Sequence, residues 1–215
     1  KTPTVKSKKV ALALQGGAAL GSFSWGVLDR LLEDERLEIE GVSGTSSGAV
    51  NALVLAYGMI ENDRSQAREL LESFWKRISE ESEKRRWGRL RSLRLLGPRV
   101  FQIRRKDVFF EVMSRILLPY HYDPVTMNPL RGVVEETINF DRLHSSKTIS
   151  LFINATNIAT NNNHVFARNK INIDSICASC CLPFLFDAVN IEGEQYWDGG
   201  YMGNPTIYPL IDECS

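Results

Sequence analysis

Cysteine and histidine are scarce in this chain, which has four cysteines and three histidines among its 215 residues. The cysteines all lie in the last fifth of the sequence, two of them are adjacent, and they form no pair of CxxC units. This spacing excludes the common zinc-binding patterns and favours small buried thiols in a reducing compartment over disulfide bridges. We therefore expect no metal site.

Long apolar runs are also missing from the sequence. No stretch of eighteen apolar residues occurs, and the first nine residues, KTPTVKSKK, are polar. A membrane-spanning helix and a signal peptide both require an apolar run, so the sequence shows neither of them. We expect a cytoplasmic protein or one that binds a membrane peripherally.

Neither charge sign predominates in the whole chain, because 26 basic residues balance 26 acidic ones. This balance excludes a global field that would attract nucleic acid. Residues 76–106 differ, with twelve basic residues against three acidic ones, and within them RWGRLRSLRLL at 86–96 interleaves arginine with tryptophan and leucine. This segment fits either an anionic membrane surface or a solvated face whose leucines pack on the domain. It has no aromatic platform for stacking bases, so we expect no nucleic acid partner.

Strand and helix patterns alternate over the first sixty residues. KVALALQ at 9–15 predicts a strand buried on both faces, and residues 20–32 repeat apolar side chains every three or four positions, as a helix does. A second short strand at 39–42 and a helix of small residues from Gly48 follow. Glycine turns separate each strand from the next helix, which is typical of a parallel α/β sheet.

The rest of the sequence predicts further helices and then hairpins. Apolar stripes recur at 67–78 and 108–116, and Asn128-Pro129 predicts the cap and first turn of another helix. Strand-like segments flank the polar turns at 161–163 and 192–194. No internal repeat or low-complexity linker occurs, so residues 1–215 are interpreted as one domain that includes the basic segment 76–106.

The stretch Gly44-Thr45-Ser46-Ser47-Gly48 matches the pattern G-x-S-x-G between a predicted strand and a predicted helix. In this setting the serine is strained with its hydroxyl exposed, and side chains larger than hydrogen at the two glycines would collide with neighbouring elements. The pattern selects Ser46 as a nucleophile and makes the Ser47 amide available to bind an oxyanion. A surface turn uses the same residue types, so the motif alone does not decide.

A second glycine turn, GGAALG at 16–21, follows the first strand at a helix start, where free amides and the helix dipole favour negative charge. It loosely resembles G-x-G-x-x-G, with Glu38 or Glu40 near the spacing of a ribose-binding acid, which would indicate a dinucleotide. Ala18 stands at the middle glycine of that pattern. The other interpretation is an oxyanion loop, which uses both turns for one reaction.

A third turn, WDGG at 197–200, places a carboxylate between a short strand and two glycines. A tight surface turn has this composition, but a serine nucleophile also requires a base. Burial would raise the pKa of Asp198 and allow it to act directly, or to orient a histidine. His121, His144 and His164 do not lie in glycine turns, and surface or core positions are expected for them.

Three blocks, ALALQGGAALGSFSWGVL, GVSGTSSGAVNAL and YWDGGYMGNP, resemble in order the signature blocks of patatin-like phospholipases. The segments ASCCLPFLF at 178–186 and FINATNI at 152–158 are similar to that family as well. The resemblance implies a three-layer α/β/α fold with a mainly parallel central sheet. It also implies hydrolysis of lipid esters by a Ser46–Asp198 dyad, with the amides of Gly16, Gly17 and Ala18 binding the oxyanion, and no cofactor or metal.

Two departures from the family pattern bear on these expectations. The family loop usually reads Gly-Gly-Gly, and Ala18 would distort it unless its φ stays negative. The chain also stops soon after Asp198, so we expect the C-terminal part of such a domain to be missing. Two alternatives remain: a non-catalytic lipid-binding or interaction module of the same fold, and a Ser-His-Asp esterase that uses His164.

Overall fold

The computed structural model describes residues 7–93, 129–183 and 186–214. The apolar stripe expected at 108–116 and His121 lie outside these ranges, as do the side chains of the basic, possibly lipid-facing segment 86–96. None of the described helices has a stretch long and apolar enough to span a bilayer.

Six strands form one sheet in the order β1-β2-β3-β6-β5, with β4 paired to β3 outside this path. The first three strands run parallel, and β4, β6 and β5 each pair with an antiparallel neighbour. The strands are β1 (Lys8–Leu14), β2 (Leu37–Thr45), β3 (Ser150–Asn157), β4 (Asn162–Ala167), β5 (Val189–Ile191) and β6 (Glu194–Asp198). Both predicted hairpins, β3–β4 and β5–β6, are confirmed.

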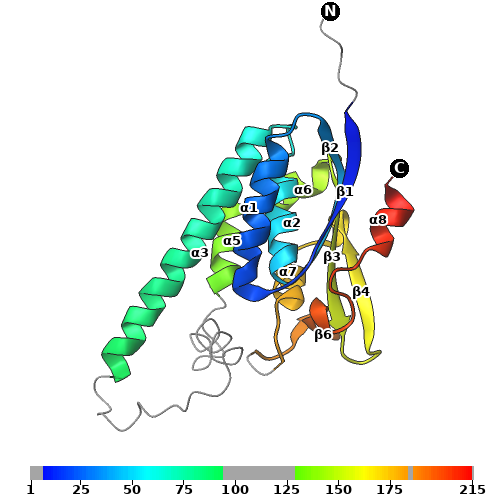
Figure 1. The fold of residues 1–215 in the computed structure, drawn as a ribbon. Helices are drawn as coiled ribbons and strands as arrows, with labels where there is room; N and C mark the ends of the chain where they lie inside the picture. The colour runs from blue at the N-terminus through cyan, green and yellow to red at the C-terminus, as the bar shows by residue number, and fades with distance from the viewer. Residues whose placement is uncertain (1–6, 94–128, 184–185, 215) are drawn as a thin grey trace, which may run out of the picture.

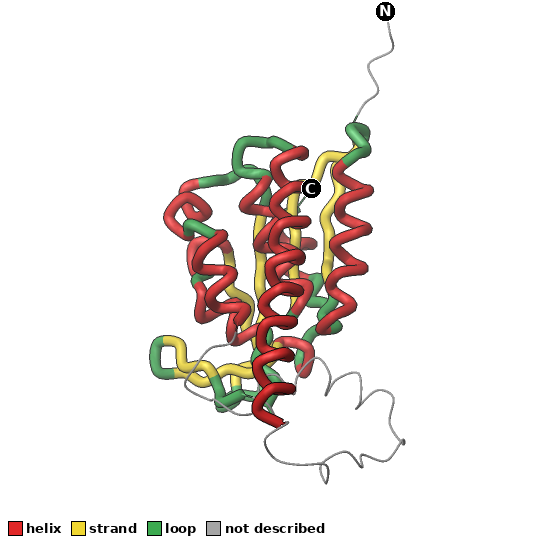
Figure 2. The backbone as a smooth tube through the Cα atoms, turned by 90° about the vertical axis from the view of Figure 1, so that its left-hand side faces the viewer, coloured by secondary structure: helices red, strands yellow, loops and turns green. Residues whose placement is uncertain are grey.

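Helices cover both faces of the sheet, so the predicted three-layer α/β fold is confirmed. Figure 1 shows most helices on one side of the strands and α8 on the other, and Figure 2 views the molecule from the helical side. On that side α2 and α7 contact the strands, while α1, α3 and α5 lie further out. The helices are α1 (Gly21–Leu32), α2 (Ser47–Gly58), α3 (Arg64–Leu93), α5 (Pro129–Thr137), α6 (Phe140–Ser145), α7 (Ile173–Ser179) and α8 (Tyr208–Glu213).

Helix α2 lies at the centre of the core. Every residue of α2 except Tyr57 is buried, because its sequence, SGAVNALVLAYG, is almost entirely small or apolar. On one side it packs against β2 and β3, and on the other it packs against the buried stripe Ala67, Leu71 and Phe74 of α3. The turn that contains Ser46 is therefore joined directly to a helix whose residues are almost all buried.

One expectation about burial is wrong. Strand β1 is not buried on both faces: Lys8, Lys9 and Ala11 are exposed, because β1 is at the edge of the described sheet and pairs only with β2 there. The apolar stripe of α1 is only partly buried, since Leu28 is buried whereas Phe23 is 74% exposed. Periodicity predicted the helix correctly, but it could not show which apolar positions meet a partner.

Candidate active site

Ser46 is the single residue between the end of β2 at Thr45 and the start of α2 at Ser47. Its backbone has φ 54° and ψ −123°, a region that residues other than glycine rarely adopt. Such strain persists only where surrounding contacts hold it, and it is common at functional sites. The amide of Ser46 donates a hydrogen bond to the hydroxyl of buried Ser179 over 2.9 Å, and this contact fixes the turn. The strand–turn–helix setting predicted for the nucleophile is present.

The two glycines of the motif allow this turn to pack against its neighbours. A Cβ atom at Gly44 would lie 2.3 Å from the carbonyl oxygen of Gly48, and one at Gly48 would lie 2.1 Å from the carbonyl oxygen of Leu14. Both distances are far shorter than van der Waals contact, so any side chain at either glycine would push the neighbouring backbone segments apart. The glycines let α2 begin directly beside the end of β1, next to the glycine loop.

The register of strand β3 brings Asp198 to Ser46. Strand β4 occupies one side of β3, and on the other side β2 pairs with residues 150–154 and β6 with residues 155–157. Thr45 is opposite Asn154, and Asp198 is opposite Ala155. Strand β6 thus begins to pair where β2 turns away into α2, and Ser46 and Asp198 meet although 152 positions apart in sequence.

The carboxyl group of Asp198 is buried and incompletely hydrogen-bonded. Asp198 is 4% exposed, its Oδ1 accepts the Gly200 amide over 2.8 Å, and its Oδ2 is buried with no hydrogen-bond partner in the described part of the chain. Burial raises the pKa of Asp198, and the Gly200 amide and the Ser46 hydroxyl oppose that shift. The group combines raised basicity with an unsatisfied acceptor close to a hydroxyl, as a general base requires.

The glycine loop lies against Ser46. A Cβ atom at Gly16 would be 2.7 Å from the Cβ of Ser46, so only glycine fits there. The Gly16 amide donates to Oδ1 of Asn204 over 2.6 Å, and the Gly17 amide donates to the hydroxyl of Ser47 over 3.0 Å. These two predicted oxyanion donors are therefore engaged by side chains in this structure.

Two other amides beside Ser46 lie at first positions of helices. Ala18 begins the short 3₁₀ helix η1 (Ala18–Leu20), and Ser47 begins α2. Amides at such positions have no acceptor within their own helix, and the helix dipole adds positive potential there. Ala18 has φ 50°, so it does not keep the negative φ under which its methyl group would fit the loop without strain.

The described histidines are placed for structural roles. The His164 ring packs against Phe166 and Tyr196, with centroid distances of 4.5 Å and 5.3 Å. Nε2 of His144 lies 2.7 Å from the carbonyl oxygen of Ile171. No contact recorded among the described residues joins either ring to Ser46 or Asp198.

The cysteines and acidic residues do not form a metal centre in the described ranges, where no group of three or more potential ligands occurs. All four cysteines are free, as expected, and Cys177 and Cys181 are buried. Burial raises the pKa of the Cys181 thiol to about 12, so it stays protonated and unreactive at neutral pH.

Sequence reasoning missed two residues that hold the site together. Ser179 accepts the Ser46 amide, and Asn204 binds the glycine loop to the segment that follows Asp198. Both residues lie within blocks that resemble family signatures, ASCCLPFLF and YMGNP, so their position was visible but their role was not. A contact between distant segments has no local signature.

Comparison with known proteins identifies the family of the chain. A model of patatin-like phospholipases matches residues 12–211, whereas no curated protein sequence is similar enough to count as a match. Similar solved structures include VipD from Legionella pneumophila, with 19% identity, coverage of 91% of this chain and 46% of that chain, and a TM-score of 0.49. Another is a chain of the heterodimeric ExoU–SpcU complex from the type III secretion system of Pseudomonas aeruginosa, with 18% identity, coverage of 81% and 36%, and a TM-score of 0.35. The chain spans less than half the length of either structure. Because the family model covers nearly all of the sequence, the chain belongs to the patatin-like phospholipase family.

Proposed function

We propose that the protein hydrolyses carboxylic esters of lipids through a Ser46–Asp198 dyad. The observation that carries the proposal is the buried, unpartnered Oδ2 of Asp198 beside a serine held at φ 54° between β2 and α2. A serine in a strained turn and a buried carboxylate at the end of β6 thus lie beside each other, which supports acyl transfer.

In the proposed reaction the Ser46 hydroxyl oxygen attacks the ester carbonyl carbon while its proton passes to Asp198. The carbonyl oxygen becomes an oxyanion near the N-termini of η1 and α2, where the amides of Ser47 and Ala18 can bind it. The amides of Gly16 and Gly17 can join them once they release the side chains of Asn204 and Ser47. Collapse of the tetrahedral intermediate breaks the ester bond, and Asp198 returns the proton to the departing alcohol. Water, deprotonated by Asp198, then attacks the acyl-serine; the bond from the acyl carbon to the Ser46 oxygen breaks, Asp198 returns the proton to that oxygen, and the fatty acid leaves.

A fluorophosphonate probe and a lipid hydrolysis panel test this mechanism. Wild-type protein should be labelled and should release fatty acid, whereas Ser46→Ala and Asp198→Asn should do neither. Matched controls are Ser73→Ala and Asp212→Asn, which change exposed residues of α3 and α8 and should behave as wild type. His164→Ala should also remain active, because the His164 ring packs against Phe166 and Tyr196. Loss of labelling and hydrolysis in His164→Ala would contradict the dyad and support a histidine-dependent mechanism.

A non-catalytic lipid-binding module is the second candidate function. It is favoured by the engagement of the Gly16 and Gly17 amides with Asn204 and Ser47, which leaves fewer donors for an oxyanion. Loss of one donor typically lowers turnover about 100-fold without abolishing it. A folded protein that binds lipid but shows neither labelling nor hydrolysis would support the module and refute the enzyme.

A further inference from the structure

A continuous apolar surface is exposed where the chain leaves the glycine loop and enters α1. Leu20 is 70% exposed, Phe23 is 74% exposed and Val27 is 43% exposed. Their spacing of three and four residues places them on one face of the helix. The opposite face, which includes Leu28 and Leu32, is buried in the core, so the outer residues do not contribute to folding to a similar degree.

The segment that forms this surface carries no charged residue of its own. Between Lys9 and Asp29 the sequence contains no acidic or basic residue. Gly26 is exposed as well, and a Cβ atom there would meet nothing within 4 Å. Exposed apolar surface without charge is unusual for a solvated helix face and commonly marks a binding site.

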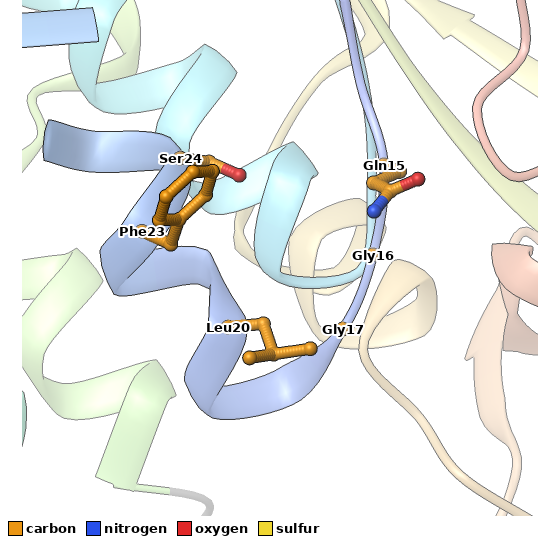
Figure 3. A pocket seen from close by; sticks show the side chains of 6 residues that line it. All are labelled: Gln15, Gly16, Gly17, Leu20, Phe23 and Ser24. Atoms are coloured by element: carbon orange, nitrogen blue, oxygen red, sulfur yellow. The ribbon is translucent and has the colours of Figure 1, made fainter. Parts of the chain in front are cut away.

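The surface adjoins the glycine loop of the candidate active site. A pocket at the junction of β1 and α1 is lined by Gln15, Gly16, Gly17, Leu20, Phe23 and Ser24 (Figure 3). Figure 3 shows Leu20 reaching back from the helix toward Gly17. A Cβ atom at Gly17 would lie 3.2 Å from the Cβ of Leu20 and 3.6 Å from its Cδ1, and one at Gly16 would touch Ser46.

We propose that Leu20 and Phe23 bind the acyl chain of the ester that Ser46 attacks. This inference rests on the proposed function, because that function places the scissile carbonyl between Ser46 and the glycine loop. The acyl chain begins at that carbonyl, and the glycine loop leads directly into the exposed apolar side chain of Leu20.

The pocket chemistry favours a hydrocarbon chain over a polar ligand. Among the described residues, Gln15 and Ser24 are the ones that contribute polar side chains to its lining, and no charged side chain of the described part of the chain does. A saturated chain needs no hydrogen-bond partner, and each methylene group removed from water contributes about 0.8 kcal/mol. The structure therefore assigns selection for medium and long acyl chains to this end of α1.

The first experiment compares p-nitrophenyl butyrate with p-nitrophenyl decanoate as substrates. Leu20→Ser and Phe23→Ser should each lower kcat/KM for the decanoate about tenfold more than for the butyrate, as expected from loss of contact with roughly two methylene groups. Ile211→Ser is the matched control: Ile211 is 72% exposed, but it lies on α8 across the sheet and should leave both substrates unchanged. Equal losses for both esters would mean that Leu20 and Phe23 only support the loop, and would overturn the inference.

The second experiment measures binding without hydrolysis. Ser46→Ala protein is titrated with dansyl-undecanoic acid, whose fluorescence rises in an apolar site, and adding Phe23→Ser should weaken binding about tenfold whereas adding Ile211→Ser should not. One outcome is that wild type hydrolyses neither ester while Phe23→Ser still weakens binding of the fatty acid. In that case the proposed function is wrong, but the acyl-binding site is supported. If hydrolysis is normal but Leu20→Ser and Phe23→Ser change neither chain preference nor binding, the acyl site fails. A change of oligomeric state in Phe23→Ser with unaltered binding would assign the surface to a second copy of the chain and also refute the proposal.

Discussion

Replacing Gly48 by alanine should move the turn that contains Ser46 away from the glycine loop at 16–21. Gly48 is the second residue of α2, and its added methyl carbon would lie 2.1 Å from the carbonyl oxygen of Leu14 and 2.7 Å from that of Gln15. Both oxygens belong to backbone at the end of β1, which cannot turn aside as a flexible side chain could. The start of α2 must therefore move away from β1 and carry Ser46 with it.

The size of the effect follows from comparison with Gly26, a helical glycine in open surroundings. Alanine in place of glycine within a helix stabilises a protein by about 0.5–1 kcal/mol, and Gly26→Ala should show this gain because nothing lies within 4 Å of the new atom. Overpacking a close contact costs about 1–3 kcal/mol. Since the gain in propensity is broadly common to both sites, Gly48→Ala should be less stable than Gly26→Ala by roughly the overpacking cost of ~1–3 kcal/mol.

Urea unfolding measures the two free energies, and fluorophosphonate labelling reports the position of Ser46. Gly48→Ala should lose stability and label much more slowly, while Gly26→Ala should unfold at a higher urea concentration and label as wild type. Equal stability of the two variants, or full labelling of Gly48→Ala, would refute the view that the motif glycines are required for close packing.

Two further changes test the electrostatics and the loop. Because burial raises the pKa of Asp198, its contribution to stability is fully present below the unfolded value near 3.8 and is lost as pH rises through the folded value. Asp198→Asn should therefore unfold at a higher temperature than wild type at neutral pH, with the difference shrinking as pH falls; a constant difference across pH would contradict this. Ala18→Gly removes a strain of ~1–2 kcal/mol at φ 50° but adds a chain-entropy cost of ~0.5–1 kcal/mol, so urea unfolding should change by less than about 1.5 kcal/mol. Its labelling should become faster, and slower labelling would show that the alanine loop is already well formed.

The sequence alone predicts the elements of the fold that have local causes. The three glycine turns, the buried helix after Ser46 and both hairpins follow from residue types that restrict or free the backbone nearby. The same reasoning identified Ser46 and Asp198 as candidates, since each lies in a turn beside a strand end. The exposure of β1 could not be predicted, because it depends on which strand lies next to it.

Contacts between distant segments were the other part that sequence reasoning could not supply. Ser179 and Asn204 hold the Ser46 amide and the Gly16 amide from positions far along the chain. A serine after a helical pattern or an asparagine before a proline is common in many proteins, so neither residue type indicates its partner. Likewise, Phe23 fits a helical apolar stripe whether its ring faces the core or solvent.

The register of β3 explains why the site forms where it does. Asn154 and Ala155 are consecutive residues, yet the first pairs with Thr45 of β2 and the second with Asp198 of β6. A shift of β6 by one residue would turn the Asp198 side chain to the other face of the sheet, away from Ser46. Two contacts oppose such a shift: the Thr156 hydroxyl donates to the carbonyl oxygen of Asp198 over 2.8 Å, and a Cβ atom at Gly199 would lie 2.4 Å from the carbonyl oxygen of Asn154. Gly199 is therefore required for the pairing of β6 with β3 as well as for the turn, because only glycine lets the end of β6 pack closely against Asn154, the residue opposite Thr45.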